Sequence, residues 1–425
     1  MTTEMIILQN GRIVDPATGK DGIGDVWIED GVFIASRPEV PERAFCLDLS
    51  GKWVTPGLID MHVHLREPGH EYKETIETGT SAAAAGGFTA VACMPNTRPV
   101  NDNAAVTRFI LEKAAGCAAR VYPVGAISRE SMGEHLAEYG EMKSAGAVAL
   151  TDDGMPVVDS QLMRRAMEYA TSHDLLVMSH AEEMSLSRNG CMNEGPVSTR
   201  LGLRGIPAAA ESIMVYREIA LAELTGARVH ISHVSSEPSV ALIRQAKLRG
   251  VRVTAETAPH YFSLTEEDVG NYNTHAKMNP PLRSERDRQA IRQALADGTL
   301  DAIATDHAPH SVLEKDVEFS YAANGIIGLE TSLPLALRLV HEGVLSPVQL
   351  VDRMSCAPAR ILGVGGGRIA CGEPADLTVV DPDRLFTYSA ATGRSKARNT
   401  PFDGWQFRGK AVLTIRDGRI THRDL

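Results

Sequence analysis

No stretch of this chain stays apolar over the ~18 residues that a membrane-spanning helix needs. The first residues, MTTEMIILQN, lack a basic segment followed by a long apolar run, so we expect no secretory leader. The six cysteines are widely spread and form no CxxC pair, which argues against a paired-cysteine zinc or redox site. Reduced thiols are typical of the cytosol, and these absences together predict a cytoplasmic protein.

Positive charge is scarce as well. The 43 lysines and arginines are outnumbered by 54 aspartates and glutamates, which gives a net charge of −11. Neither nucleic acid nor an anionic membrane is therefore expected as a partner. A small anion can still bind wherever arginine, histidine and asparagine side chains gather locally.

The chain is long enough for one large domain and a smaller one, since 43% of its 425 residues are hydrophobic. Short β-rich runs with Asn-Gly or Asp-Gly turn signals occupy both ends. These runs are MIILQNGRIVDP, GDVWIEDGVFIAS, ADLTVVDPD and GKAVLTIRDGRITHRDL. We predict that residues 1–55 and 364–425 build one small composite β-domain, with the glycine-rich run GVGGG at 363–367 as the joint.

In the central residues 56–363, short apolar runs alternate with amphipathic helical stretches. Eight runs are candidate strands: the one that ends in IDMHVH, followed by TAVACM, RVYPVGAI, AVALTD, LLVMSH, RVHISH, VRVTAE and DAIATD. Repeated strand–helix units predict an α/β fold with a parallel sheet, most simply a (β/α)8 barrel. An open doubly wound sheet is the alternative, and the lack of a GxGxxG motif at a helix start argues against it.

Candidate metal ligands fall at the carboxyl ends of the predicted strands, where catalytic residues of such barrels lie. They are His62 and His64 after the first strand, the pair Asp152 and Asp153 after the fourth, His180 after the fifth, His233 after the sixth and Asp306 after the eighth. The interval from His180 to His233 exceeds one strand–helix unit, so we expect an inserted loop around NEGPVSTRLGLRGIPAAAE. Imidazole and carboxylate groups suit Zn²⁺, and a bridging carboxylate suits two metal ions about 3.5–4 Å apart.

Successive side chains of a strand point to opposite faces, and this affects which residues near the strand ends can be metal ligands. Only one of Asp152 and Asp153 can face the barrel interior, and the residues alone do not decide which. His230 falls on the opposite face from His233 and is expected to be structural. The sequence therefore predicts a site for one or two zinc ions, built from four histidines and two carboxylates.

An arginine follows the first two candidate ligands. In HVHLR, residues His62, His64 and Arg66 would share one face of an extended strand. A guanidinium has no lone pair to offer a metal. Its place beside a cationic site therefore indicates an anionic ligand, and arginine suits a carboxylate because its planar fork pairs two donors with two oxygens.

Seven motifs in order along nearly the whole chain resemble the dihydroorotase family of the amidohydrolase superfamily. They are DMHVHLREPG, MPNTRPV, TDDG, NEGPVS, MNPPLR, ATDHAPH and GIIGLETSLP. The runs NGRIVDP and GEPADLTVVDP are similar to the composite β-domain of that family. Several motifs are shared with hydantoinases and allantoinases, whereas HLREPG, MPNT and TDHAPH in combination are more specific to dihydroorotases.

The resemblance implies reversible cyclisation of N-carbamoyl-L-aspartate to L-dihydroorotate in pyrimidine (UMP) biosynthesis. It implies that His62, His64, Asp153 and Asp306 hold one zinc ion and that Asp153, His180 and His233 hold a second. Many relatives bridge the metals with a carboxylated lysine at the fourth strand. Here that strand has no lysine and Lys143 lies too far upstream, so the resemblance makes Asp153 the bridge and leaves one or two metals open.

The resemblance also implies roles for side chains around the metals. Asp306 is the expected catalytic acid–base group. The expected substrate contacts are Arg66, Asn96 and His310 at the carboxylate, Asn279 at the ring amide, Asn324 and Gly325 through backbone hydrogen bonds, and His64. The substrate itself is a small anion, dihydroorotate or N-carbamoyl-aspartate.

Two other functions compete with this interpretation. Another cyclic amidohydrolase, acting on hydantoin, dihydropyrimidine or allantoin, would not need Arg66, Asn96 and His310, because its substrates are neutral. A non-catalytic dihydroorotase-like partner of aspartate transcarbamoylase would have lost metal ligands, and this chain keeps all six. A homo-oligomer and a complex of the active enzyme with aspartate transcarbamoylase are both compatible with the resemblance.

Overall fold

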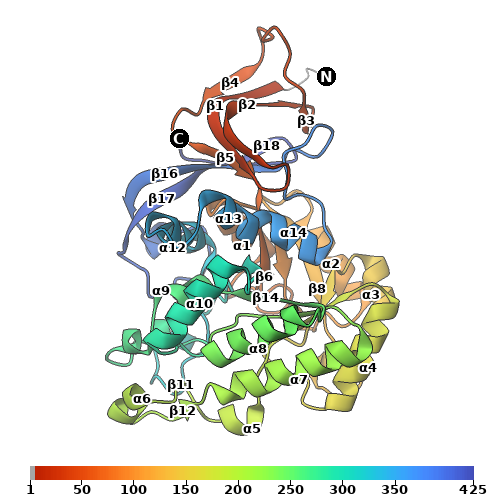
Figure 1. The fold of residues 1–425 in the computed structure, drawn as a ribbon, viewed down its shortest axis with the longest axis vertical. Coiled ribbons are helices and arrows are strands. Elements are labelled where there is room, and N and C mark those ends of the chain that lie inside the picture. The colour runs from red at the N-terminus through yellow and green to blue at the C-terminus, as the bar shows by residue number, and fades with distance from the viewer. Residues whose placement is uncertain (1–4) are drawn as a thin grey trace.

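The computed structural model describes residues 5–425. Residues 1–4, part of the stretch in which no secretory leader is expected, lie outside the described residues. Figure 1 shows a β-sheet at the top, coloured from both ends of the chain, and a second sheet surrounded by helices below it.

The upper sheet combines the two ends of the sequence. Its strands run in the order β18-β17-β16-β5-β1-β2-β3, with β4 paired to β1. They are β1 (Met5–Asp15), β2 (Lys20–Glu29), β3 (Val32–Ile34), β4 (Phe45–Asp48), β5 (Trp53–Pro56), β16 (Leu377–Thr387), β17 (Gln406–Arg416) and β18 (Arg419–Arg423). The antiparallel pair β5–β16 joins the two ends, and one apolar cluster takes residues from both, among them Leu8 and Leu413.

Eight parallel strands form the lower sheet, in the order β6-β7-β8-β9-β10-β13-β14-β15. They are β6 (Leu58–Val63), β7 (Phe88–Cys93), β8 (Arg120–Gly125), β9 (Ala149–Leu150), β10 (Leu176–Ser179), β13 (Val229–Ile231), β14 (Val253–Thr257) and β15 (Ala302–Ile303). The sheet closes onto itself after β15, where the backbone N–H of His64 donates to the carbonyl of His307 at 2.8 Å. The predicted (β/α)8 barrel with an additional β-domain is confirmed.

Helices follow the barrel strands and cover the outside of the lower sheet (Figure 1). They are α1 (Ile76–Ala85), α2 (Ala104–Ala114), α3 (Tyr139–Ala145), α4 (Ser160–Ser172), α5 (Met184–Ser187), α7 (Ala209–Thr225), α8 (Glu237–Leu248), α9 (Pro259–Ser263), α10 (Glu285–Asp297), α11 (Val312–Lys315), α12 (Leu329–His341), α13 (Pro347–Val351) and α14 (Ala357–Leu362). Shorter turns are η1 (Arg129–Ser131), η2 (Glu266–Val269), η3 (Thr274–Ala276), η4 (Asp352–Cys356) and η5 (Ala390–Thr392). Among the described helices, none combines the length and the apolar character that crossing a membrane requires.

Helix α4 shows how the sequence produces these elements. Its N-terminus is capped by Asp159, whose side chain accepts hydrogen bonds from two backbone N–H groups of the first turn. Met163, Ala166, Met167 and Ala170 follow the spacing of one helix face, and all four are buried. Strand β7, in contrast, is buried along its whole length, as expected for a parallel strand covered on both faces.

The predicted insertion between His180 and His233 contains α6 (Pro196–Leu201) and a small parallel sheet of β11 (Met192–Asn193) and β12 (Gly205–Ile206). The glycine run 363–367 follows directly after α14. We propose 1–55 with 364–425 and 56–363 as the domain division, although β5 of the upper sheet extends to Pro56, one residue past the first boundary.

Candidate active site

A cavity of about 220 Å³ opens at the carboxyl ends of the barrel strands. The predicted site residues that line it are His64, Arg66, Asn96, Asp153, His180, His233, Asn279, Asp306, His310, Asn324 and Gly325. His62 does not line the cavity, since 0% of its surface is exposed, but it contacts Asp153, which does. The structure therefore places every predicted site residue in one neighbourhood, together with Gly154 and Ala308, which the sequence did not single out.

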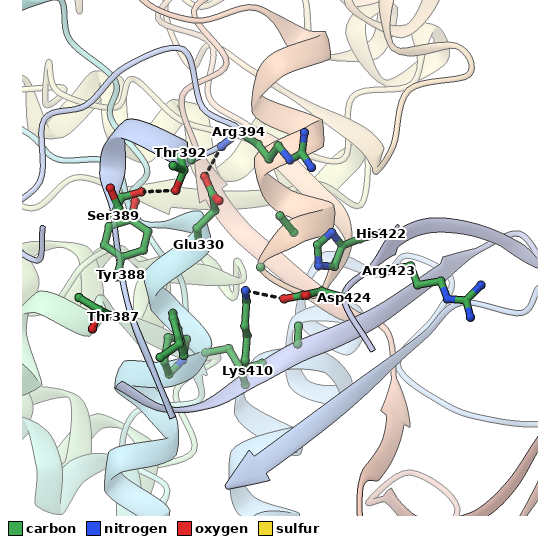
Figure 2. Close-up of a pocket in the computed structure, with 17 residues that line it drawn as sticks. Glu330, Thr387, Tyr388, Ser389, Thr392, Arg394, Lys410, His422, Arg423 and Asp424 are labelled. Carbon is green, nitrogen blue, oxygen red and sulfur yellow. Dashed lines mark hydrogen bonds and ion pairs between the residues drawn. The ribbon is translucent and has the colours of Figure 1, made fainter. Parts of the chain in front are cut away.

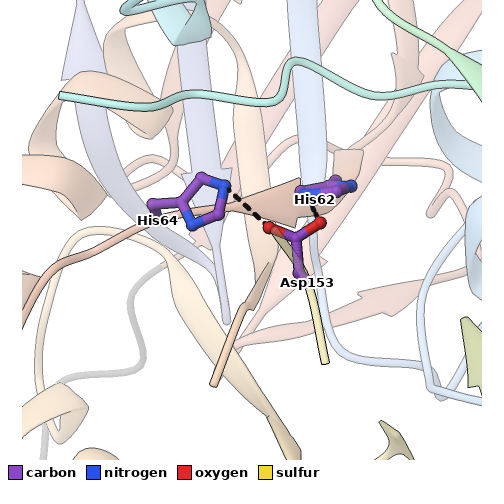
Figure 3. Close-up of side chains that lie close together, drawn as sticks. All are labelled: His62, His64 and Asp153. Atoms are coloured by element: carbon purple, nitrogen blue, oxygen red, sulfur yellow. Dashed lines mark ion pairs between the residues drawn. The ribbon is translucent and has the colours of Figure 1, made fainter. Parts of the chain in front are cut away.

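Asp153 lies at the centre of the candidate metal ligands. Its Oδ1 lies 3.2 Å from Nε2 of His62, and its Oδ2 lies 3.4 Å from Nε2 of His64 (Figure 3). On the other side, Oδ1 lies 3.7 Å from Nδ1 of His180 and 3.6 Å from Nε2 of His233. One carboxylate thus belongs to two groups of candidate ligands, and within each group the ligand atoms lie within 4.8 Å of one another.

Two of the imidazoles turn their Nε2 atoms towards Asp153. Nδ1 of His62 donates to Oε1 of Glu256 at 2.8 Å, and Nδ1 of His64 donates to Oδ1 of Asn96 at 2.8 Å. Each Nε2 therefore faces a carboxylate oxygen, an arrangement that calls for either a proton or a metal cation between the two atoms. Burial lowers the pKa of His62, but Asp153 and Glu256 raise it well above its ordinary value. The surroundings of His62 therefore favour a positive charge at this position.

The chemistry of these groups fits zinc. Nε2 of His62 and Oδ1 of Asp153 are buried and have no hydrogen-bond partner among the described residues. Nδ1 of His180 and Nε2 of His233 lie only 2.9 Å apart, so a proton or a metal ion must sit between their lone pairs. Imidazole and carboxylate donors beside an open cavity are the ligand set of catalytic zinc sites.

The neighbouring carboxylates of the TDDG motif have different surroundings. Asp152 points away from the histidines, and its Oδ1 accepts hydrogen bonds from the backbone N–H groups of Ile127 and Ser128 at 2.8 and 3.1 Å. Burial raises the pKa of Asp152 to about 6. Asp153 is therefore the member of the pair that reaches the candidate ligands.

Asp306 lines the cavity beside His62 and His64. Its Oδ1 is 3.1 Å from Nε2 of His64 and 3.7 Å from Nε2 of His62. Burial alone would raise the pKa of Asp306, but its contact with His64 and the charge of His62 hold it below the ordinary range of a carboxyl group. The side chain is therefore ionised at neutral pH, so it can accept a proton.

Glu256 of β14 belongs to the site, and the sequence analysis missed it. Its second oxygen lies 3.3 Å from Nε2 of His230, and although burial raises its pKa, His230 and His62 lower it to about 2. His230 thus faces the same interior network as His62. The predicted opposition of His230 and His233 is wrong, because β13 ends at Ile231 and His233 reaches the site from a turn in which its φ is 36°.

We expect Glu256→Gln to weaken zinc binding about 10- to 100-fold, because the neutral amide no longer fixes His62 or supports its basicity. Competition with a chromophoric chelator measures this affinity. Glu266→Gln is the matched control, since Glu266 is a buried glutamate that accepts a hydrogen bond from Asn193, away from the histidines. Equal zinc affinity in Glu256→Gln and the unaltered chain would show that this carboxylate does not support the site.

A second carboxylate of this kind follows His180 in the sequence HAEE. Oε2 of Glu182 lies 2.9 Å from Nε2 of His180 and accepts a hydrogen bond from Nδ2 of Asn279 at 2.9 Å. Burial raises the pKa of Glu182, but His180 lowers it to about 2. Asn279, expected at the ring amide, lines the cavity and at the same time holds Glu182. A carboxylate two residues after a strand-end histidine was the signal that could have found this pair.

Arg66 lines the cavity, although not as a strand residue. Strand β6 ends at Val63, and the φ of Arg66 is 63°, in the left-handed region. The expectation that an extended strand carries Arg66 onto the ligand face is therefore wrong, because the extended conformation stops three residues earlier. The guanidinium still reaches the site, where Nε donates to the carbonyl of Pro309 at 3.2 Å and Nη2 lies 3.4 Å from Nε2 of His310.

His310 is a neutral imidazole on the same wall. Its Nε2 donates to the carbonyl of Asn324 at 2.8 Å, and its Nδ1 lies 3.4 Å from Nζ of Lys73. Burial, Arg66 and Lys73 lower the pKa of His310 to about 3. Lys73, which the sequence analysis missed, is paired with Glu314 at 2.6 Å. The guanidinium of Arg66 is therefore the cation on this wall that is left for an anionic ligand.

The chain is similar to known proteins in both sequence and fold. A family model described as dihydro-orotase-like matches residues 51–239. A dihydroorotase of Desulfotalea psychrophila is 68% identical over 98% of this chain and 99% of its own length, and one of Syntrophotalea carbinolica is 57% identical over 98% and 99%. Among solved structures, the L-hydantoinase of Arthrobacter aurescens is similar with a TM-score of 0.89 and 26% identity, over 100% of this chain and 97% of that one.

Proposed function

The chain belongs to the dihydroorotase family, and we propose that its cavity interconverts N-carbamoyl-L-aspartate and L-dihydroorotate in pyrimidine biosynthesis. This makes it a cyclic amide hydrolase. The observation that carries the choice of substrate is the guanidinium of Arg66 on the cavity wall, beside the candidate metal ligands. A cation that cannot bind metal is stabilised there by an anion, and dihydroorotate carries a carboxylate.

We propose zinc as the cofactor, with one or two ions per chain. The ligands would be His62, His64, Asp153 and Asp306 at one position and Asp153, His180 and His233 at the other. When bound, zinc polarises a carbonyl group and lowers the pKa of water from 15.7 to about 7. Glu256 and Glu182 would orient the histidines from behind.

Other side chains of the cavity would transfer the proton and bind the substrate. Hydrolysis adds the oxygen of water to the ring carbonyl carbon, breaks the ring C–N bond and places a proton on the departing nitrogen. The ionised Asp306 takes the proton from water and delivers it to that nitrogen, and ring closure follows the same path in reverse. The wall formed by Arg66, Asn96 and His310 would hold the carboxylate, with the guanidinium of Arg66 and Nδ2 of Asn96 as the donors, while Asn279 orients the ring amide.

The competing functions are separated by the same residues. Hydantoin and dihydropyrimidine rings carry no carboxylate, so a hydantoinase has no use for the guanidinium of Arg66. A non-catalytic partner of aspartate transcarbamoylase has no use for the candidate ligands around Asp153, all of which are in place. A homo-oligomer, a complex with aspartate transcarbamoylase and a cytoplasmic location stay predictions.

We expect the purified chain to convert dihydroorotate into N-carbamoyl-aspartate and back, with between about one and two zinc ions bound per chain. Chromatography of the products and elemental analysis of the same sample measure both. A strong chelator should abolish turnover, and added zinc should restore it. Active protein without stoichiometric metal contradicts the zinc assignment, whereas zinc-loaded protein that turns over hydantoin but not dihydroorotate contradicts the substrate.

A further inference from the structure

Part of the C-terminal region returns to the catalytic end of the barrel. Between η5 and β17 the chain leaves the upper sheet and packs on α12, where the backbone N–H of Arg394 donates to Glu330 at 2.8 Å (Figure 2). One residue later, the hydroxyl of Ser395 bonds to the buried Glu74, whose other oxygen accepts from the backbone N–H of Lys396 at 2.9 Å. These contacts fix the start of the segment 394–400.

Asn399, near the end of this segment, has the contacts that matter for the cavity. The residue is 3% exposed. Its Nδ2 donates to the carbonyls of Ala308 at 2.9 Å and of Gly325 at 3.1 Å, and its Oδ1 accepts from the backbone N–H of His310 at 3.0 Å. Its own carbonyl accepts from the N–H of Ile327 at 2.9 Å. Every hydrogen of the side-chain amide is thus used to join two cavity-lining loops.

The two loops meet at very close range. The φ of Gly325 is 118°, and a Cβ at this position would lie 2.5 Å from Cβ of Ala308 and 3.5 Å from Nε2 of His310. Glycine is therefore required by both backbone conformation and space. The spacing between His310 and Gly325 is set by packing on one side and by the amide of Asn399 on the other.

We infer that Asn399 is a positioning residue for the substrate carboxylate. It touches neither the cavity nor the candidate metal ligands, but it holds His310 and Gly325 at a fixed separation. A segment far from the barrel strands in sequence therefore supports one wall of the candidate substrate site from behind. The inference rests on the proposed function, because the wall that Asn399 supports is the one assigned to the carboxylate.

Asn399→Asp and Asn399→Ala test this role. The first replaces two donors by an oxygen that repels the carbonyls of Ala308 and Gly325, and the second removes the bridge without adding charge. We expect KM for dihydroorotate to rise about 10- to 100-fold in both, since small displacements of positioning groups have effects of this size. The fall in kcat should be smaller than the rise in KM, and zinc content should not change.

Asn193→Asp is the matched control. Asn193 is also a buried asparagine with a bonded amide, which donates to Glu266 at 2.8 Å and accepts from Arg283 at 2.9 Å, but it lies in the inserted loop. The Asn193→Asp variant should have a lower melting temperature but an unaltered KM for dihydroorotate. Folded, zinc-loaded Asn399 variants with an unaltered KM, or a KM that rises equally in Asn193→Asp, would overturn the inference.

A variant at a different position, Gly325, keeps the test decisive if both Asn399 variants fail to fold. Gly325→Ala forces apart the same two loops from the other side, so it should raise KM by a similar factor with zinc retained. An unchanged KM in folded Gly325→Ala would show that the spacing does not govern substrate binding. Failure of the proposed function would look different, because the unaltered chain would then not turn over dihydroorotate.

Discussion

Dihydroorotate is expected to be turned over about 10⁴-fold faster than dihydrouracil or hydantoin at equal concentration. The carboxylate is the group that the two neutral rings lack, and Arg66, which lines the cavity, is the side chain that we propose to pair with it. When a neutral ring binds, the guanidinium is left without its anionic partner. Sites built around such a polar contact reject the analogue that lacks it by factors of this size, because their donors stay unpaired. Initial rates of the zinc-loaded chain on the three compounds measure the ratio.

Variants of Arg66 separate its charge from its geometry. Arg66→Lys keeps a positive charge but loses the planar fork, so it should lower kcat/KM for dihydroorotate, and Arg66→Ala should lower it further. Neither should change the slow rate on dihydrouracil. Arg164→Lys, at an ion pair with Glu168 on the surface of α4, is the control and should leave all rates unaltered. Equal rates on dihydroorotate and dihydrouracil, or an unchanged kcat/KM for dihydroorotate in Arg66→Ala, would favour a hydantoinase-like enzyme.

The positions of the candidate metal ligands could be predicted because the barrel topology largely determines where strand-end residues lie. Apolar runs of strand length recur along the chain, and parallel strands of one sheet end at the same rim. A polar residue such as His180 or His233, directly after an apolar run, is therefore carried to that rim whatever the details of its loop. This is why residues from widely separated strands could be grouped without knowledge of a single contact.

The directions of the side chains could not be predicted in the same way. Arg66, His233 and Asp306 have φ values of 63°, 36° and 49°, so each leaves the extended conformation just after its strand ends. Such conformations cost on the order of 1–3 kcal/mol for residues other than glycine. Because the cost is borne by surrounding packing, these three positions carry ordinary side chains and not the glycine that would reveal a left-handed conformation. Strand alternation consequently failed for Arg66 and for His233.

The residues that support the candidate ligands and the cavity wall were not predicted from the sequence, for a related reason. Glu256 could have been suspected, because a carboxylate inside the apolar run VRVTAE needs a buried partner. Asn399 offers no such signal, since asparagine in a polar segment of a terminal β-domain is typical of a surface loop. Its role follows only from the return of segment 394–400 to the barrel, which is a long-range property of the fold.

Asp306→Asn is expected to lower turnover of dihydroorotate by about 10²- to 10⁴-fold, the range typical of a positioned acid–base group. The amide keeps the shape of the side chain but cannot accept a proton from water or return one to the ring nitrogen. Zinc should remain bound, because His62, His64 and Asp153 still supply ligands. Single-turnover rates together with zinc content distinguish loss of proton transfer from loss of metal.

Asp301→Asn provides the control at the other end of the same strand. Asp301 lies directly before the amino end of β15, and its carboxylate is paired with Lys247 at 2.6 Å. Its replacement should reduce thermal stability and leave turnover unaltered. If Asp306→Asn also turned over normally with its full zinc content, another group would have to move the proton. The depressed pKa of Asp306 would then reflect only its contact with the histidines, and the carboxylate would act as a metal ligand without a role in acid–base chemistry.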